Sequence, residues 1–284
     1  MSQINIDLSC HAGLGVFGKA YRAMLERDPH APGSVDRVLV EKMVRLCQET
    51  ADLLYSGFTP TTVQCIPGTR PVLERLVSSV VGQAAGAEEK VSALSGLTAG
   101  LREKVAGQTL EDMRVGGTEE QILKCGSDWC TDVARVGCAL FQVAGFPSRL
   151  VYLADTQKAY SGHAIVEVFR QGVWGGVDTG TGVIYRREEN CPASVWELMK
   201  NPKLVDRHRT PLAGYSSPNQ FRAAAVSNYF IREAAKFNYA VSGLNDYYRS
   251  ILGMSGSGWP GGLRWLHGEE ARYWRGDQEE DDLK

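Results

Sequence analysis

Two short runs of apolar and β-branched residues, at 162–169 and 173–178, lie on either side of an Arg-Gln-Gly segment at 170–172. Each run is too short for a typical helix and is rich in the residue types favoured in strands. A short connection that contains glycine joins antiparallel neighbours. The sequence therefore predicts a β-hairpin, and a turn at 170–172 would place His163 opposite Asp178 on the neighbouring strand.

A helix is predicted to begin beside Cys130, where Ser127 or Asp128 can cap it by accepting free backbone N–H groups. Gly145 and Pro147 supply its stop signal. The unpaired N–H groups of a helix start carry partial positive charge, which favours the thiolate form of a cysteine in the first turn. Cys130 is therefore a candidate nucleophile. The residues that recur at helical spacing and form the apolar stripe are Val133, Val136, Gly137, Leu140, Val143 and Ala144.

Cys130, His163 and Asp178 thus occur in the order of a thiol nucleophile, its base and the acid that orients the base. Taken singly, each residue has a structural explanation. The cysteine would be a buried small hydrophobic residue, as we expect for Cys138, the histidine a structural residue with its hydrogen bonds satisfied, and the aspartate a turn former. Their order and their predicted elements together favour the catalytic hypothesis. Glu167, on the same strand face as His163, is expected to be a solvated residue.

This arrangement resembles the core of the transglutaminase-like superfamily over about residues 116–185. The resemblance rests on the helix-start cysteine, Ala-Gly-Phe-Pro-Ser-Arg-Leu-Val at 144–151, Gly-His-Ala-x-x-Glu-Val from position 162, and Trp-x-x-Val-Asp from position 174. It implies a papain-like triad that transfers acyl groups through a thioester. By position, it assigns the nucleophile to Cys130, the base to His163 and the orienting acid to Asp178.

The chain departs from the family pattern at several positions. Many members carry an aromatic residue two positions after the histidine, where this chain has Ile165, and the Gly175-Gly176 pair before the aspartate is unusually small. These differences bear on the shape of the substrate and not on the triad. Some enzymes with a similar core have a zinc-binding pair upstream of the nucleophile, which the lone Cys125 does not reproduce.

Three other motifs point elsewhere, but their context argues against them. Residues 13–18 match a dinucleotide-binding fingerprint, yet the segment that should follow as a strand, 34–55, has helical periodicity. Residues 178–180 resemble an aspartic-protease loop, which needs a second aspartate that only a homodimer could supply. The Arg-Gly-Asp at 275–277 is attributed to chance.

Composition limits the remaining function classes. The net charge of −2 provides no basic footprint for nucleic acid. No apolar run approaches the ~18 residues of a membrane span, and no signal-peptide pattern is visible, so we expect a soluble cytoplasmic protein. Seven scattered cysteines indicate free thiols, and the five histidines lack the spacing of metal ligands. We therefore expect neither a metal nor another cofactor.

The predicted fold class is α+β, with an antiparallel sheet packed on the nucleophile helix and further helices on both sides in sequence. We expect an N-terminal helical region (1–112), a transglutaminase-like core (113–200), C-terminal helices packed on the core (201–254) and a flexible, acidic tail (255–284). The predicted helices are 34–55, 71–85, 88–106, one after the capping box at 118–121, 195–199 and 221–239, and the predicted strands are 148–154, 162–169, 173–178 and 182–186.

The chemistry expected of such a site is attack by the Cys130 thiolate on an acyl carbon, with the Cys130 backbone N–H in an oxyanion hole. Protonated His163 would release the leaving group, and Asp178 would hold the imidazole tautomer. Trp129 is a candidate second oxyanion donor or groove wall. The expected partner is an amide- or thioester-containing substrate, free or bound to a carrier protein.

Three functions remain open at this point, as does the oligomeric state. Water as the acyl acceptor would make the protein an amidase or peptidase. An amine would make it an amide-forming acyltransferase in small-molecule biosynthesis. The third function is a non-catalytic binding module on the same fold, which the presence of all three triad residues argues against.

Overall fold

The computed structural model describes residues 44–46, 48–55, 65, 67–82, 84, 86–108, 118–154, 162–188, 190–208 and 217–227. The motifs at 13–18 and 275–277 and the predicted tail at 255–284 lie outside these residues. None of the helices described is long and apolar enough to cross a membrane.

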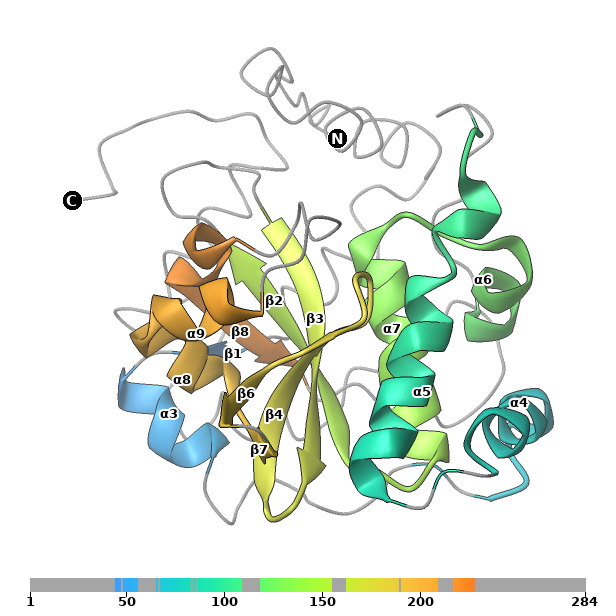
Figure 1. Ribbon diagram of the computed structural model, residues 1–284, viewed down its shortest axis with the longest axis horizontal. Coiled ribbons are helices and arrows are strands. Elements are labelled where there is room, and N and C mark those ends of the chain that lie inside the picture. The colour runs from blue at the N-terminus through green and yellow to red at the C-terminus, as the bar shows by residue number, and fades with distance from the viewer. Residues whose placement is uncertain are drawn as a thin grey trace, which may run out of the picture.

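A six-stranded antiparallel sheet forms the centre of the described structure, with the strand order β1-β8-β2-β3-β4-β5 (Figure 1). A separate two-stranded sheet pairs β6 with β7. The strands are β1 (Val44–Leu46), β2 (Ser148–Ala154), β3 (Gly162–Arg170), β4 (Val173–Asp178), β5 (Val183–Ile184), β6 (Arg186–Glu188), β7 (Cys191–Pro192) and β8 (Ala223–Ser227).

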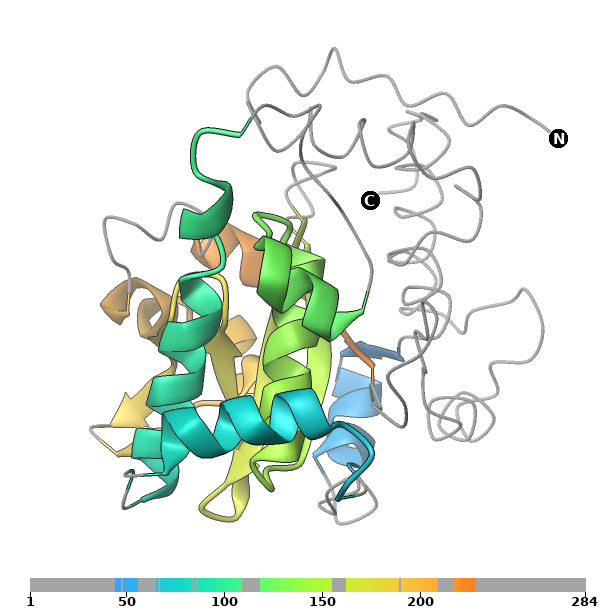
Figure 2. The same cartoon turned by 90° about the vertical axis from the view of Figure 1, so that its right-hand side faces the viewer.

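Helices cover both faces of the sheet and create two hydrophobic cores. Alternate residues of β3 supply the two cores, with Val166 and Val168 facing the α7 side and Ile165 facing the α8 side. On the α7 side lie α4 (Pro71–Val81), α5 (Ala87–Ala99), α6 (Glu119–Cys125) and α7 (Cys130–Val143), and on the α8 side lie α3 (Gln48–Leu54), α8 (Val195–Lys200) and α9 (Pro202–Arg207) (Figures 1 and 2). Two 3₁₀ turns, η3 (Glu103–Val105) and η4 (Pro218–Arg222), complete the elements. The predicted α+β class is confirmed.

Helix α7 is the central helix, since it lies between the sheet and α5 and buries every residue from Thr131 to Gln142. It ends at Val143, and Gly145 follows with a φ of +89°, as its stop signals predict. Gly137 permits a close approach to the β4–β5 turn, because a Cβ at this position would overlap the side chain of Thr179. The middle of α7 therefore lies directly against the turn that follows β4.

Buried ion pairs anchor α7 to its neighbours. Arg70, which is fully buried, pairs with Glu119 at 2.8 Å and Glu120 at 2.7 Å, at the start of α6. Arg135 of α7 pairs with the same Glu119 and with Asp132. Breaking one partner of such a network leaves a buried charge uncompensated, so these contacts hold α4, α6 and α7 in one arrangement.

Glu167 is fully buried, and the prediction that it is solvated is wrong. Its carboxylate pairs with Arg149 Nη2 at 2.7 Å and accepts hydrogen bonds from the Tyr55 hydroxyl at 2.8 Å and the Val195 backbone N–H at 2.7 Å. The Arg149 guanidinium also lies over the ring of Trp174, at 4.1 Å from its centroid. The strand face that carries Glu167 is covered by α3 and α8, which the sequence pattern did not reveal.

Two predicted helices differ from the structure. In the segment 34–55, residues 44–46 form strand β1 and only residues 48–54 are helical, while the part before residue 44 lies outside the described residues. In the segment 221–239, residues 223–227 form strand β8, and the part after residue 227 is likewise outside them. Strand β8 is alanine-rich, but it lies between β1 and β2, so pairing on both edges overrides its helical propensity.

The other predicted elements are present, with shifted ends. The helices predicted at 71–85 and 88–106 end earlier, at Val81 and Ala99. Helix α6 begins directly after Thr118, the N-cap residue of the predicted capping box. The predicted strands correspond to β2, β3, β4 and β5.

Candidate active site

Cys130 is the first residue of α7, and the residue before it, Trp129, occupies the N-cap position. The predicted cap by Ser127 or Asp128 is wrong, because the N-cap has no side-chain hydrogen bond. Ser127 Oγ instead accepts from the Trp129 backbone N–H at 3.0 Å, before the helix begins. The chain enters this segment through Gly126, whose φ of +81° is a conformation that favours glycine.

His163 and Asp178 are joined by the β3–β4 hairpin. His163 Nε2 lies 2.9 Å from Asp178 Oδ2, and both side chains are buried. The register pairs Arg170 with Val173, so the hairpin turn is the dipeptide at 171–172, and both turn residues have positive φ. The same register puts Asp178 opposite residue 165 and diagonal to His163. The expected pairing of His163 directly opposite Asp178 is therefore shifted by two residues.

Asp178 is held by a second contact that fixes its direction. Its Oδ1 accepts the backbone N–H of Gly180 at 3.0 Å, while Oδ2 faces His163. Both carboxylate oxygens are therefore used, and the carboxylate plane is set by the turn after β4. His163 in turn has Nε2 on Asp178, which leaves Nδ1 as the ring nitrogen that can serve Cys130.

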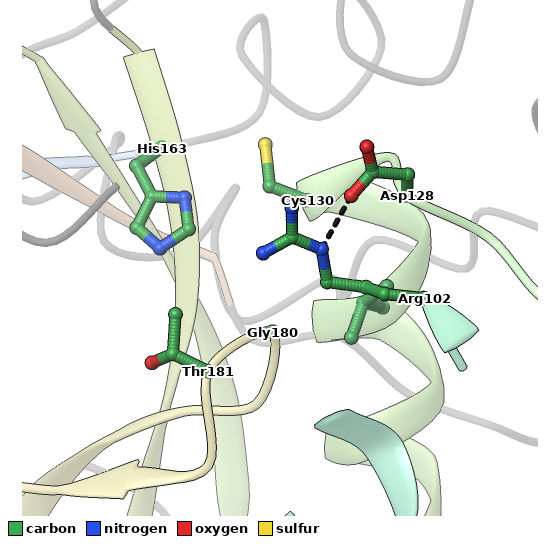
Figure 3. Close-up of a pocket in the computed structure, with 7 residues that line it drawn as sticks. Arg102, Asp128, Cys130, His163, Gly180 and Thr181 are labelled. Atoms are coloured by element: carbon green, nitrogen blue, oxygen red, sulfur yellow. Dashed lines mark hydrogen bonds and ion pairs between the residues drawn. The ribbon is translucent and has the colours of Figure 1, made fainter. Parts of the chain in front are cut away.

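Cys130 and His163 line the same cleft, which is partly open to solvent (Figure 3). Cys130 is partly exposed, unlike the buried His163 and Asp178. A thiol at the mouth and an imidazole in the wall suit attack on a ligand that enters from solvent. The residues that line the cleft are Arg102, Asp128, Cys130, Val133, His163, Gly180 and Thr181.

The electrostatics of the cleft favour a protonated imidazole. Burial lowers the pKa of His163, but the charge and hydrogen bond of Asp178, with a further contribution from Cys130, outweigh it and raise the pKa from 6.5 to about 10. His163 therefore carries a proton at neutral pH. An imidazolium in this position can give its proton to a leaving group in the cleft.

Trp129 is not brought into the cleft. Its side chain is buried with 1% exposure, it is not among the residues that line the cleft, and its backbone N–H donates to Ser127. The structure instead places Arg102 and Asp128 there, paired through Arg102 Nε and Asp128 Oδ1. Sequence analysis missed both as site residues. Asp128 is close to Cys130 in sequence, whereas Arg102 comes from the segment after α5 and has no local signal.

Other thiols of the described segments differ from Cys130. Cys138 is fully buried within α7, and burial raises the pKa of its thiol to about 12, so it is not a nucleophile at neutral pH. The prediction that it is a buried small residue is confirmed. No group of three or more His, Cys, Asp or Glu side chains in the described ranges could hold a metal ion.

Part of the chain matches a known protein family. Residues 75–179 match the model of the transglutaminase-like superfamily, so the resemblance expected from the sequence is confirmed for this segment. The match runs from α4 to the end of β4 and contains Cys130, His163 and Asp178. Searches of curated proteins and of solved structures gave no match.

Proposed function

Because residues 75–179 match the model of the transglutaminase-like superfamily, we propose that this protein catalyses cysteine-dependent acyl transfer through a thioester acyl-enzyme. The observation that supports this most strongly is that His163, which lines the cleft together with Cys130, is paired through Nε2 with Asp178 Oδ2 at 2.9 Å. In this proposal Cys130 is the nucleophile, His163 the acid and base, and Asp178 the orienting acid.

The first half-reaction forms the acyl-enzyme. The sulfur of Cys130 donates an electron pair to the acyl carbon, and the carbonyl π pair moves to oxygen. When the carbonyl re-forms, the bond to the leaving group breaks, and the leaving group takes the proton that His163 carries at neutral pH. Asp178 stabilises the imidazolium and keeps Nδ1 directed to the thiol side.

The second half-reaction transfers the acyl group to an acceptor. His163, now neutral, removes a proton from water or an amine, and the acceptor displaces the Cys130 sulfur. Water gives a hydrolase of the amidase or peptidase type, and an amine gives an amide-forming acyltransferase that could take its acyl group from a carrier-bound thioester. Both share the same acyl-enzyme, so one set of experiments tests the chemistry before the acceptor is known.

A non-catalytic binding module on this fold would have no need of a buried His–Asp pair beside a partly exposed thiol. Burial of both His163 and Asp178 costs desolvation energy, which their mutual attraction must offset. Their retention is explained by a task at the cleft.

Selective alkylation tests the nucleophile. Iodoacetamide at about pH 6 should label Cys130 before the other cysteines, because Cys130 lines the cleft beside the His163 imidazole. Peptide mass spectrometry locates the label. The matched control is Cys125→Ala, which removes a partly exposed thiol five positions away and outside the cleft, and should leave the rate unchanged. Equal labelling of all exposed thiols would contradict the proposal.

Intact mass spectrometry tests the acyl-enzyme directly. After incubation with panels of thioesters and amides, the wild-type protein should gain the mass of an acyl group, and Cys130→Ala should not. The added mass identifies the acyl donor. Loss of the adduct in buffer alone indicates hydrolysis, whereas loss that requires an added amine indicates acyl transfer to that amine. An adduct that persists in Cys130→Ala would refute the role of this thiol.

A further inference from the structure

The cleft contains a cation that the triad does not use, Arg102. We propose that Arg102 is the side-chain donor of the oxyanion hole, and that Asp128 positions it. This inference rests on the proposed function, since it assigns a partner to the oxygen on which negative charge develops when Cys130 attacks.

Arg102 reaches the site from a segment far from Cys130 in sequence. It lies just after α5 and directly before η3, and its Nε donates to Asp128 Oδ1. Asp128 is itself two residues before Cys130, so this ion pair joins the α5 end to the start of α7. Figure 3 shows the guanidinium end of Arg102 extending into the cleft, between Cys130 and Gly180.

The other groups of the cleft do not supply a second donor at the sulfur. The Gly180 backbone N–H donates to Asp178 Oδ1, and that of Thr181 donates to the Asp178 carbonyl. The Thr181 hydroxyl points away from Cys130 in Figure 3. Val133 is apolar, and the proton of His163 is needed by the leaving group. Among the described lining residues, this points to Arg102 as the side chain that forms the oxyanion hole together with the Cys130 backbone N–H.

Charge balance favours this role over the binding of an anionic substrate. Asp128 already neutralises Arg102, so the pair presents a directed N–H donor with little net attraction for a permanent anion. Attack by the thiolate creates no new charge but moves one from the sulfur of Cys130 to the carbonyl oxygen. An N–H group fixed beside that oxygen stabilises the transition state more than the ground state.

In the acylation step, the sulfur–carbon bond forms as the carbonyl π pair becomes a lone pair on oxygen, and the Arg102 N–H donates to that oxygen. The lone pair then returns, and the bond to the leaving group breaks as this group takes the His163 proton. Arg102 is charged before and after, and it transfers no proton. Its effect is therefore electrostatic.

Two reactions of the same thiol separate this role from others. Acylation by p-nitrophenyl acetate passes through an oxyanion, whereas alkylation by iodoacetamide displaces iodide and forms none. Arg102→Met should slow acylation by about 10²–10³-fold, the usual loss when an oxyanion donor is removed, and change alkylation little. Arg102→Lys should recover part of the acylation rate. Arg75→Met, at an exposed arginine of α4, is the matched control and should change neither.

Asp128 is tested by the same ratio of acylation to alkylation. In Asp128→Asn the amide oxygen can still accept a hydrogen bond from Arg102 Nε, but the ionic attraction is lost. The ratio of acylation to alkylation should therefore fall by less than in Arg102→Met. A purely structural effect would instead lower both rates together.

The failure of each proposal is distinguishable. Equal loss of acylation and alkylation in Arg102→Met, or an unchanged acylation rate, would overturn the role of Arg102 while leaving Cys130 as the nucleophile. Acylation of the Cys130→Ala variant at the wild-type rate would overturn the proposed function itself. If Arg102→Met does not fold, Arg102→Lys answers the question, because a full wild-type ratio there shows that the directed guanidinium is not needed.

Discussion

The buried pair of His163 and Asp178 predicts a specific dependence of stability on pH. The pKa of His163 rises from 6.5 in the unfolded chain to about 10 in the folded protein, with Asp178 as the main cause of the increase. A group with a raised folded-state pKa stabilises the fold fully below its unfolded value and loses that contribution as pH rises through the folded value. The relevant window therefore runs from pH 6.5 to about 10.

The magnitude follows from the two pKa values. Each tenfold difference in proton affinity corresponds to about 1.4 kcal/mol, so the full shift is worth up to about 5 kcal/mol. Within the window, the free energy of unfolding should fall by about 1.4 kcal/mol per pH unit from this group alone. Urea unfolding at a series of pH values, followed by circular dichroism, measures that slope.

Variants isolate the contribution of the pair. His163→Gln removes the titrating group, and Asp178→Asn removes the charge that raises its pKa, so both should flatten the slope between pH 6.5 and 10. His208→Gln removes a histidine outside the cleft and should keep the wild-type steepness. Equal slopes in wild type and His163→Gln would refute the argument that the buried imidazole is held protonated.

Three further predictions concern packing and the site. Glu167→Ala should lower the free energy of unfolding by about 3–5 kcal/mol, because it leaves a buried arginine uncompensated, whereas the exposed Glu188→Ala should have almost no effect in the same urea titration. Gly137→Ala should lower the melting temperature and the acylation rate, because the added Cβ overlaps the β4–β5 turn. The control Gly96→Ala, where α5 leaves space for a Cβ, should raise the free energy of unfolding by about 1 kcal/mol. An unchanged melting temperature in Gly137→Ala would contradict the close approach. Asp178→Asn should reduce kcat by up to about 10⁴-fold in steady-state assays with little change in KM, and a loss confined to KM would count against its orienting role.

The local parts of the fold were predictable because short-range signals determine them. The turn residues Gln171 and Gly172 and the β-branched runs beside them predicted the β3–β4 hairpin, and the capping box beginning at Thr118 predicted the start of α6. The two-residue shift at Asp178 was not predictable, because strand register depends on the exact turn length.

The remaining parts depend on partners that are distant in sequence. Strand β8 has a composition that favours a helix, and only its position between β1 and β2 makes it a strand. Glu167 alternates as a solvent-facing residue would, and its burial follows from Tyr55, directly after α3, and from Arg149 of β2. Arg102 enters the cleft through a tertiary contact with Asp128, which no periodicity predicts.

The position of β8 also has a consequence during synthesis on the ribosome. The segments that carry Cys130, His163 and Asp178 emerge well before residues 223–227, which must later insert between β2 and β1. Until then the outer edge of β2 exposes unpaired backbone groups, which can recruit strands from other chains. A nascent chain stalled before residue 223 should therefore contain an assembled hairpin yet aggregate readily, and release of the next few residues should protect it.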